Sequence, residues 1–138
     1  MSIRPGNVSS KINPATVLGA AAGLNVPLNN SNFAIVPHAV ITMVATATAG
    51  NRIYVVRFLS PLGNIITQTV ATTAVTANQT TNLICMAGII YSTIANPLSQ
   101  NLPLPVELSV PSLSSIQIFD AANVDVADTA AVSCFFSL

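Results

Sequence analysis

Hydrophobic and polar residues alternate along most of the chain from Phe33 onward. Between residues 39 and 48, Val and Thr at even positions alternate with Ala, Ile and Met at odd positions, which is the period of a half-buried strand. The same pattern predicts further strands at the following ranges: 52–59, 65–71, 79–86, 106–110, 114–119 and 129–136, with a short additional one at 89–94. No amphipathic helix is indicated, so the pattern predicts an all-β chain.

Turn signals separate these strands. Ser60-Pro61-Leu62-Gly63-Asn64 predicts a hairpin turn, because Pro61 presets φ and Gly63 tolerates positive φ. The proline-containing stretch 96–105 predicts a loop, and residues 120–128 predict a polar turn. About eight short strands at this spacing are typical of an antiparallel β-sandwich or a jelly-roll-like barrel.

Residues 1–32 follow neither a helical nor a strand period. Pro5, Pro14 and Pro27 exclude a continuous helix. The segment is nevertheless rich in apolar side chains: Val17, Leu18, Leu24, Val26 and Leu28. A frayed terminus is one interpretation. We expect instead an extended N-terminal arm over residues 1–32, whose five apolar residues pack on a neighbouring subunit, followed by a sandwich domain over residues 33–138.

The composition favours association with other subunits. Charged residues make up 6% of the chain, and its four basic and four acidic residues give a formal net charge of zero. Electrostatic repulsion between copies is therefore weak, which favours a homo-oligomer such as a dimer or trimer. The alternative is a monomer that is solvated by uncharged hydroxyl and amide groups.

Several partners are not expected from this composition. Mean hydropathy is +0.67, but the apolar run at residues 84–90 is far shorter than the roughly 20 residues of a membrane-spanning helix. The sequence does not open with a cationic stretch followed by an apolar block, so no secretory signal is predicted. Four scattered basic residues make no patch for a phosphate backbone. We therefore expect no membrane and no nucleic-acid partner, and assembly in a cytoplasm.

Candidate chemical groups are few. His38 is the only histidine and fits a structural imidazole; with two distant cysteines, Cys85 and Cys134, it cannot form a zinc site. Both cysteines fall in predicted strands and are expected to be buried free thiols. A disulfide between them is the alternative if their strands are neighbours. No nucleophile, phosphate-binding loop or paired acid and base is evident, so we expect no enzyme and no cofactor.

Three carboxylates crowd into the predicted polar turn. Asp120, Asp125 and Asp128, with Asn123 between them, are oxygen ligands of the kind that Ca²⁺ prefers. Their spacing is not that of an EF-hand, and the glycine of such a loop is absent. A solvated turn with local side-chain-to-backbone hydrogen bonds is favoured over a metal site.

Two stretches of the chain, residues 41–83 and 102–136, resemble small virion proteins encoded by tailed bacteriophages. The resemblance depends on an Asn-Arg turn at 51–52, a Gly-Asn turn at 63–64, Leu102-Pro103, Pro111, the "IQIFDA" strand at 116–121 and an acidic turn that ends at Asp128. It implies a β-sandwich structural protein of a phage head, neck or tail without enzymatic activity.

The expected function is that of a capsid decoration (cement) protein, located in the virion, that contacts itself and the major capsid protein or another virion protein. A neck, tail or head-fibre subunit is the closest alternative. The alternative from another class is a sandwich module that binds a carbohydrate or a host surface. The chain has no Trp, two Tyr and five Phe, a composition poor in the aromatic groups that stack on sugars.

Overall fold

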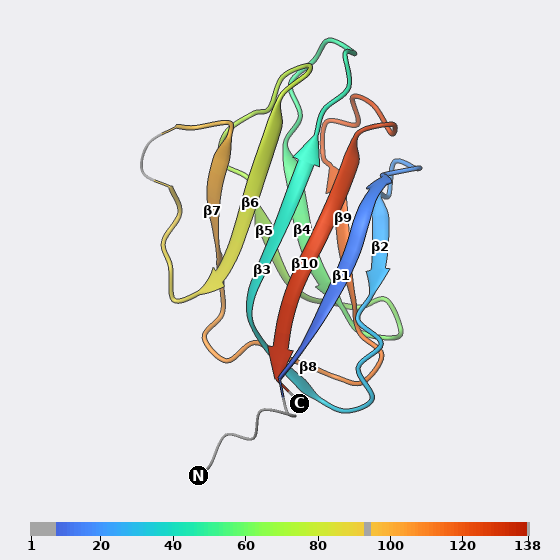
Figure 1. Ribbon diagram of the computed structural model, residues 1–138, viewed down its shortest axis with the longest axis vertical. Coiled ribbons are helices and arrows are strands. Elements are labelled where there is room, and N and C mark those ends of the chain that lie inside the picture. Colours follow the sequence, from blue (N-terminus) through green and yellow to red (C-terminus); the bar gives the residue numbers. More distant parts are fainter. Residues whose placement is uncertain (1–7, 93–94, 138) are drawn as a thin grey trace.

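The computed structural model describes residues 8–92 and 95–137. In this part of the chain ten strands and no helix are present (Figure 1). The strands are β1 (Val8–Val17), β2 (Leu24–Pro27), β3 (Ala34–Val44), β4 (Tyr54–Leu59), β5 (Ile65–Val70), β6 (Thr80–Ala87), β7 (Ser99–Leu104), β8 (Ser109–Val110), β9 (Ser115–Asp120) and β10 (Thr129–Ser137). The prediction of an all-β chain is confirmed.

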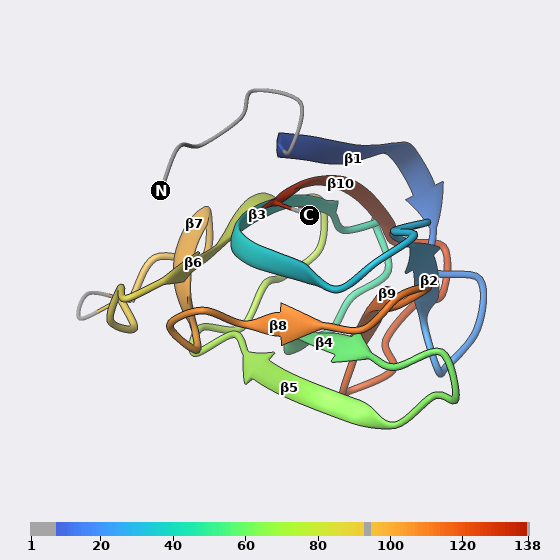
Figure 2. The ribbon, with the colours of Figure 1, turned by 90° about the horizontal axis from the view of Figure 1, so that it is seen from below.

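The strands form two sheets that pack face to face. The first sheet has the order β1-β10-β3-β6-β7, with β8 paired to the start of β3, and the second has the order β2-β9-β4-β5 (Figure 2). Both sheets are open: β1 and β7 are the end strands of the first, and β2 and β5 those of the second. The molecule is therefore a β-sandwich, and the alternative of a closed barrel is not adopted. One pair, β6 with β7, is parallel and departs from the purely antiparallel prediction.

Side chains alternate between the core and the outside, as the sequence period predicts. Tyr54, Val56 and Phe58 of β4 are fully buried, whereas Arg57 faces outward. Leu83 and Cys85 of β6 are likewise buried against both sheets. The predicted hairpin joins β4 and β5: Gly63 has φ +84°, and its N–H donates to the Ser60 carbonyl at 2.9 Å.

Residues 8–32 belong to the sandwich, which corrects the prediction of a separate arm. β1 pairs with β10 over its length, and β2 pairs with β9. The prolines that argued against regular structure lie in end strands, where a missing N–H need not break the ladder: Pro14 sits at a register shift and Pro27 ends β2. The predicted boundary at residue 32 has no counterpart in the structure, and residues 1–7 lie outside the described residues.

The second correction concerns residues 89–110. The predicted loop at 96–105 contains β7, because Gln100, Leu102 and Leu104 alternate inward like any half-buried strand. The predicted strand at 89–94 is not a strand at residues 89–92, and residues 93–94 lie outside the described residues. Of the predicted strand at 106–110, residues 109–110 alone form β8, because Glu107 has φ +57° in a turn.

Candidate functional site

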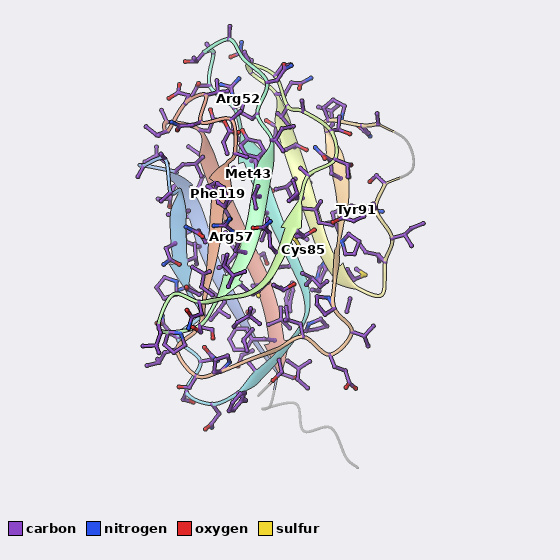
Figure 3. The ribbon with its side chains drawn as sticks, turned by 180° about the vertical axis from the view of Figure 1, so that it is seen from behind. Met43, Arg52, Arg57, Cys85, Tyr91 and Phe119 are labelled. Carbon is purple, nitrogen blue, oxygen red and sulfur yellow. The ribbon has the colours of Figure 1, made fainter. Side chains whose placement is uncertain are left out.

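An ion pair lies buried between the two sheets, at the end of the sandwich that is uppermost in Figure 3, where Arg52 is labelled. The Arg52 Nε–H donates to Asp128 Oδ2 at 3.0 Å, and both side chains are 0% exposed. Arg52 precedes β4 of the second sheet, and Asp128 precedes β10 of the first. The pair therefore joins the two sheets at this end.

Each polar group of the pair has protein partners. Asp128 also accepts hydrogen bonds from the Tyr54 hydroxyl at 2.9 Å and from the Thr46 N–H at 2.9 Å. Arg52 donates further to the carbonyls of Gly50 and Thr46 at 2.9 and 3.4 Å. Burial, and then the hydrogen bond to Asp128, raise the pKa of Tyr54 far above its usual range, so the phenol stays neutral.

The other two carboxylates of the turn organise its backbone. Asp125 accepts from the hydroxyls of Thr46 and Thr48 at 2.6 and 2.7 Å and from the Ala127 N–H at 2.9 Å. These hydrogen bonds, the one from Thr46 foremost, lower the pKa of Asp125 to about 2. Asp120 caps three N–H groups, those of Ile53, Ala122 and Val124, at 3.0, 2.9 and 2.8 Å.

The hydrogen bonds of this cluster stabilise the conformation of the chain around it. Its carboxylates are directed at hydroxyl, phenol, guanidinium and backbone N–H donors of the same chain. Among the described residues, no group of three or more His, Cys, Asp or Glu is placed to hold a metal ion. We therefore assign the cluster a structural role, as a polar link between the sheets. The spacing of Arg52 and Asp128 gave no signal of their contact, since 76 residues separate them.

The outer face of the first sheet is the larger candidate site. Strand register brings one residue from each strand into a lateral row, the outer row: Ser10, Phe135, His38, Met86 and Pro103. A second row beside it holds Ile12, Ser133, Val40, Ile84 and Asn101. Ile12, Phe135 and Met86 are exposed, and the His38 imidazole stacks on the Phe135 ring at 5.5 Å between centroids.

No charged side chain lies on this face of the described strands. Lys11 of β1 is paired in register with the buried Cys134 and so lies on the opposite side of the sheet. The remaining strands of the sheet contain no Asp, Glu, Lys or Arg. The result is a broad surface of apolar side chains interspersed with hydroxyl and amide groups and the His38 imidazole.

The outer face of the second sheet differs. Arg57 of β4 lies there, with its guanidinium 4.5 Å from the centre of the Phe119 ring (Figure 3). Its Nε–H donates to Gln68 Oε1 of β5 at 2.6 Å. A cation thus occupies the middle of this face, which separates it in character from the uncharged face opposite.

The five residues predicted to contact a neighbouring subunit lie mostly inside their own chain. Leu18, Val26 and Leu28 belong to the common core, and Leu24 is half-buried against it. Val17 alone of the five is well exposed, at 49%. The structure does not bring these side chains together as a surface. The sequence predicted most of the strands that carry the outer row. It did not predict the row itself, because the row depends on which strands are neighbours in the sheet.

The two cysteines are buried free thiols. Cys134 and Cys85 both flank Ala39 in register, so β3 separates their strands. Burial raises the pKa of each thiol to about 12, which keeps both protonated and unreactive. The disulfide that the sequence left open is not formed.

Comparison with known proteins assigns no family. No family model and no curated protein matches this chain. Among solved structures, a chain from "Structure of infectious bursal disease virus Gx strain" aligns with all of this chain at 9% identity and a TM-score of 0.35. This chain spans 36% of that chain. A similarity this low assigns neither a fold family nor a function. None of the described residues lies in a helix long and apolar enough to cross a bilayer.

Proposed function

We propose that this chain is a non-enzymatic structural protein of a virion, and that it acts as a capsid decoration (cement) protein through contacts with neighbouring subunits. The observation that carries the proposal is the uncharged outer face of the first sheet, with Phe135, Met86 and Ile12 exposed on it. Exposed apolar side chains gathered on one face of a protein are typical of sites of protein interaction.

Such a face is inexpensive to desolvate. Burying an ionised group costs several kcal/mol unless it finds a partner, and this face carries none among the described strands. Hydroxyl and amide groups of Ser133, Thr42 and Asn82 can exchange water for partner groups at little net cost. The face therefore suits a permanent contact more than a transient, electrostatically steered one.

The mechanism we propose is thermodynamic. A contact that forms in the assembled shell, and not with separate capsid subunits, stabilises the shell by mass action. Many copies that each bind weakly add up, because neighbouring contacts on one particle act at high effective concentration. The buried Arg52–Asp128 pair supports this role by fixing the two sheets relative to each other.

The resemblance of residues 41–83 and 102–136 to virion proteins of tailed phages supports the choice of a virion. Arg52 and Asp128 are among the matching positions, and in this chain they form the buried ion pair. These positions therefore support a shared framework. A carbohydrate-binding module is less well supported, since the exposed aromatic residues Phe33, Tyr91 and Phe135 lie in a loop before β3, in the β6–β7 connection and on β10.

The test is occupancy on virus particles that lack the native copy of this chain. We expect the wild-type protein to bind such particles at many copies each, and Met86→Lys to lose most of that binding, because it places a cation in the outer row, between His38 and Pro103. The matched control is Gln117→Lys, which adds the same charge to the outer face of the second sheet, where Gln117 lies between Arg57 and Asn25.

Quantitative mass spectrometry of gradient-purified particles measures this occupancy, and circular dichroism shows that the variants fold. Wild-type protein that never sediments with particles would overturn the proposal. Equal occupancy for the two lysine variants would exclude the outer face of the first sheet as the surface that contacts the particle.

A further inference from the structure

The four end strands of the two sheets are not equally protected against pairing with another strand. Exposed strand edges are usually blunted by charge, proline or short length. β1 contains Lys11 and Pro14, β7 contains Pro103, and β2 is a four-residue strand that ends at Pro27. β5, with the sequence IITQTV, has none of these features.

β5 is also well suited to pairing by its residue types. Five of its six residues are β-branched, which favours the extended backbone. It lies at the border of the molecule with β4 on its inner side (Figure 2). Ile65 is 53% exposed, and Gln68, at the middle of the strand, is exposed as well.

The direction of the β5 backbone groups follows from one hydrogen bond. The Ala71 N–H, directly after β5, donates to the Tyr54 carbonyl at 2.9 Å. Because successive residues of a strand point their N–H and C=O groups to opposite sides, Thr69 and Thr67 also turn theirs toward β4. Val70 and Gln68 turn theirs to the open side of the sheet.

We propose that two copies of this chain pair antiparallel along β5, about a two-fold axis at Gln68, so that their second sheets join into one continuous sheet. This names one partner of the assembly proposed above, a second copy of the chain, and in that sense rests on the proposed function. The axis at Gln68 sets outward-pointing residues opposite one another: Gln68 opposite the partner's Gln68, and Val70 opposite the partner's Ile66. An isologous contact of this kind closes as a dimer.

Charge does not oppose the pairing. The residue on a two-fold axis lies opposite its own copy, and that residue, Gln68, is neutral. The closest cation is Arg57 on β4, which is held by Gln68 Oε1 at 2.6 Å. Three inter-strand spacings separate it from the partner's Arg57, or about 14 Å. At physiological salt that distance exceeds the screening length of about 8 Å, so the repulsion is weak.

The experiment measures the dimer dissociation constant by sedimentation velocity over a wide range of concentrations. We expect the wild-type protein to dimerise, and Gln68→Lys to raise the dissociation constant by at least about tenfold, because two lysines then face each other across the axis, each beside an Arg57. Gln68→Glu should raise the constant less, because Arg57 pairs with the new carboxylate. An equimolar mixture of the two variants should associate more tightly than Gln68→Lys alone, since opposite charges then meet. Asn25→Lys, an exposed position on β2 at the opposite end of the same sheet, is the matched control and should leave the constant unchanged.

The mixture also separates a lost contact from a damaged fold, because two misfolded variants would not restore each other. A wild-type protein that stays monomeric at every concentration, or Gln68→Lys that dimerises like the wild type, would overturn the pairing along β5. The proposed function has its own test in particle occupancy. If the wild type binds particles and the Gln68 variants dimerise normally, the β5 pairing is wrong and the proposed function stands.

Discussion

Arg52 and Asp128 are two of the eight charged residues of the chain, and the fold buries both completely. A buried ion pair is stable when hydrogen bonds satisfy its remaining donors and acceptors, and this pair draws on Tyr54, Thr46 and the Gly50 carbonyl for that purpose. Since those groups come from β4 and from the segment between β3 and β4, whereas Asp128 lies just before β10, the pair depends on the correct assembly of both sheets.

Replacing Arg52 by Met should therefore destabilise the protein strongly. The carboxylate of Asp128 would stay buried without its cation, and such a loss typically lowers the free energy of unfolding by about 3–5 kcal/mol. Urea unfolding followed by circular dichroism measures the change. The control is Arg57→Met on the outer face, where we expect a loss below about 1 kcal/mol. Similar losses for the two variants would contradict the structural role of the buried pair.

The pKa of Asp125 predicts a defined dependence of stability on pH. The pKa of Asp125 in the folded protein, about 2, lies below the ordinary value of 3.8, so the stabilisation by Asp125 is present above pH 3.8 and is lost as the pH falls toward 2. The difference in unfolding free energy between wild type and Asp125→Asn should be constant above about pH 5 and shrink below about pH 4. Urea titrations at a series of pH values test this. A difference that does not change with pH would exclude the hydrogen bonds from Thr46 and Thr48 as its source.

At the scale of strands, β1 and β2 complete the two sheets, and the core extends into them. Leu28 is 3% exposed just after β2, whereas Leu62 at the tip of the β4–β5 turn is 88% exposed. We expect Leu28→Ala to lower the free energy of unfolding by about 2–5 kcal/mol, and Leu62→Ala by less than about 0.5 kcal/mol.

Thermal and urea unfolding at low protein concentration measure this pair of variants. Low concentration matters, because it removes any contribution from subunit contacts. An arm that packs on a neighbour would give the opposite result, with Leu28→Ala stable as a monomer and impaired in assembly. That outcome would place residues 24–28 outside the core.

The sequence predicted those elements whose pattern is complete within their own segment. β4, β5, β6, β9 and β10 alternate clearly, and the turn at 60–64 has residues that fit positive φ, so each was predicted to within two positions. A strand was also predicted at residues 39–48, whereas β3 spans Ala34–Val44. β1, β2 and β7 were missed because proline argued against them, and the tolerance for proline comes from their place at sheet ends. The position of a strand in its sheet depends on the whole fold and cannot be inferred from the segment alone. The contact of Arg52 with Asp128 was not predicted for the same reason.

For the whole molecule, the scarcity of charge predicts how association responds to salt. If contacts are formed by strand pairing and apolar surface, few ions are released or screened on binding. We expect the dissociation constant of self-association to change less than about threefold between about 0.05 and about 0.5 M sodium chloride. Light scattering after size exclusion at several salt concentrations measures it. A steep weakening with salt would indicate charged contacts involving Lys11, Arg57 or Glu107.

The place of β10 has a consequence for how the protein is made. β10 comes last of the ten strands in the chain, yet it lies between β1 and β3, and Asp128, which precedes it, completes the buried ion pair. Before β10 leaves the ribosome, β1 has no strand to pair with in the first sheet, and Arg52 has no counter-ion. Such non-local pairings fold slowly. Until β10 has been made, the apolar inner residues of β1 and β3 therefore stay uncovered on that side, and this protein is expected to depend on chaperones to avoid aggregation during its synthesis.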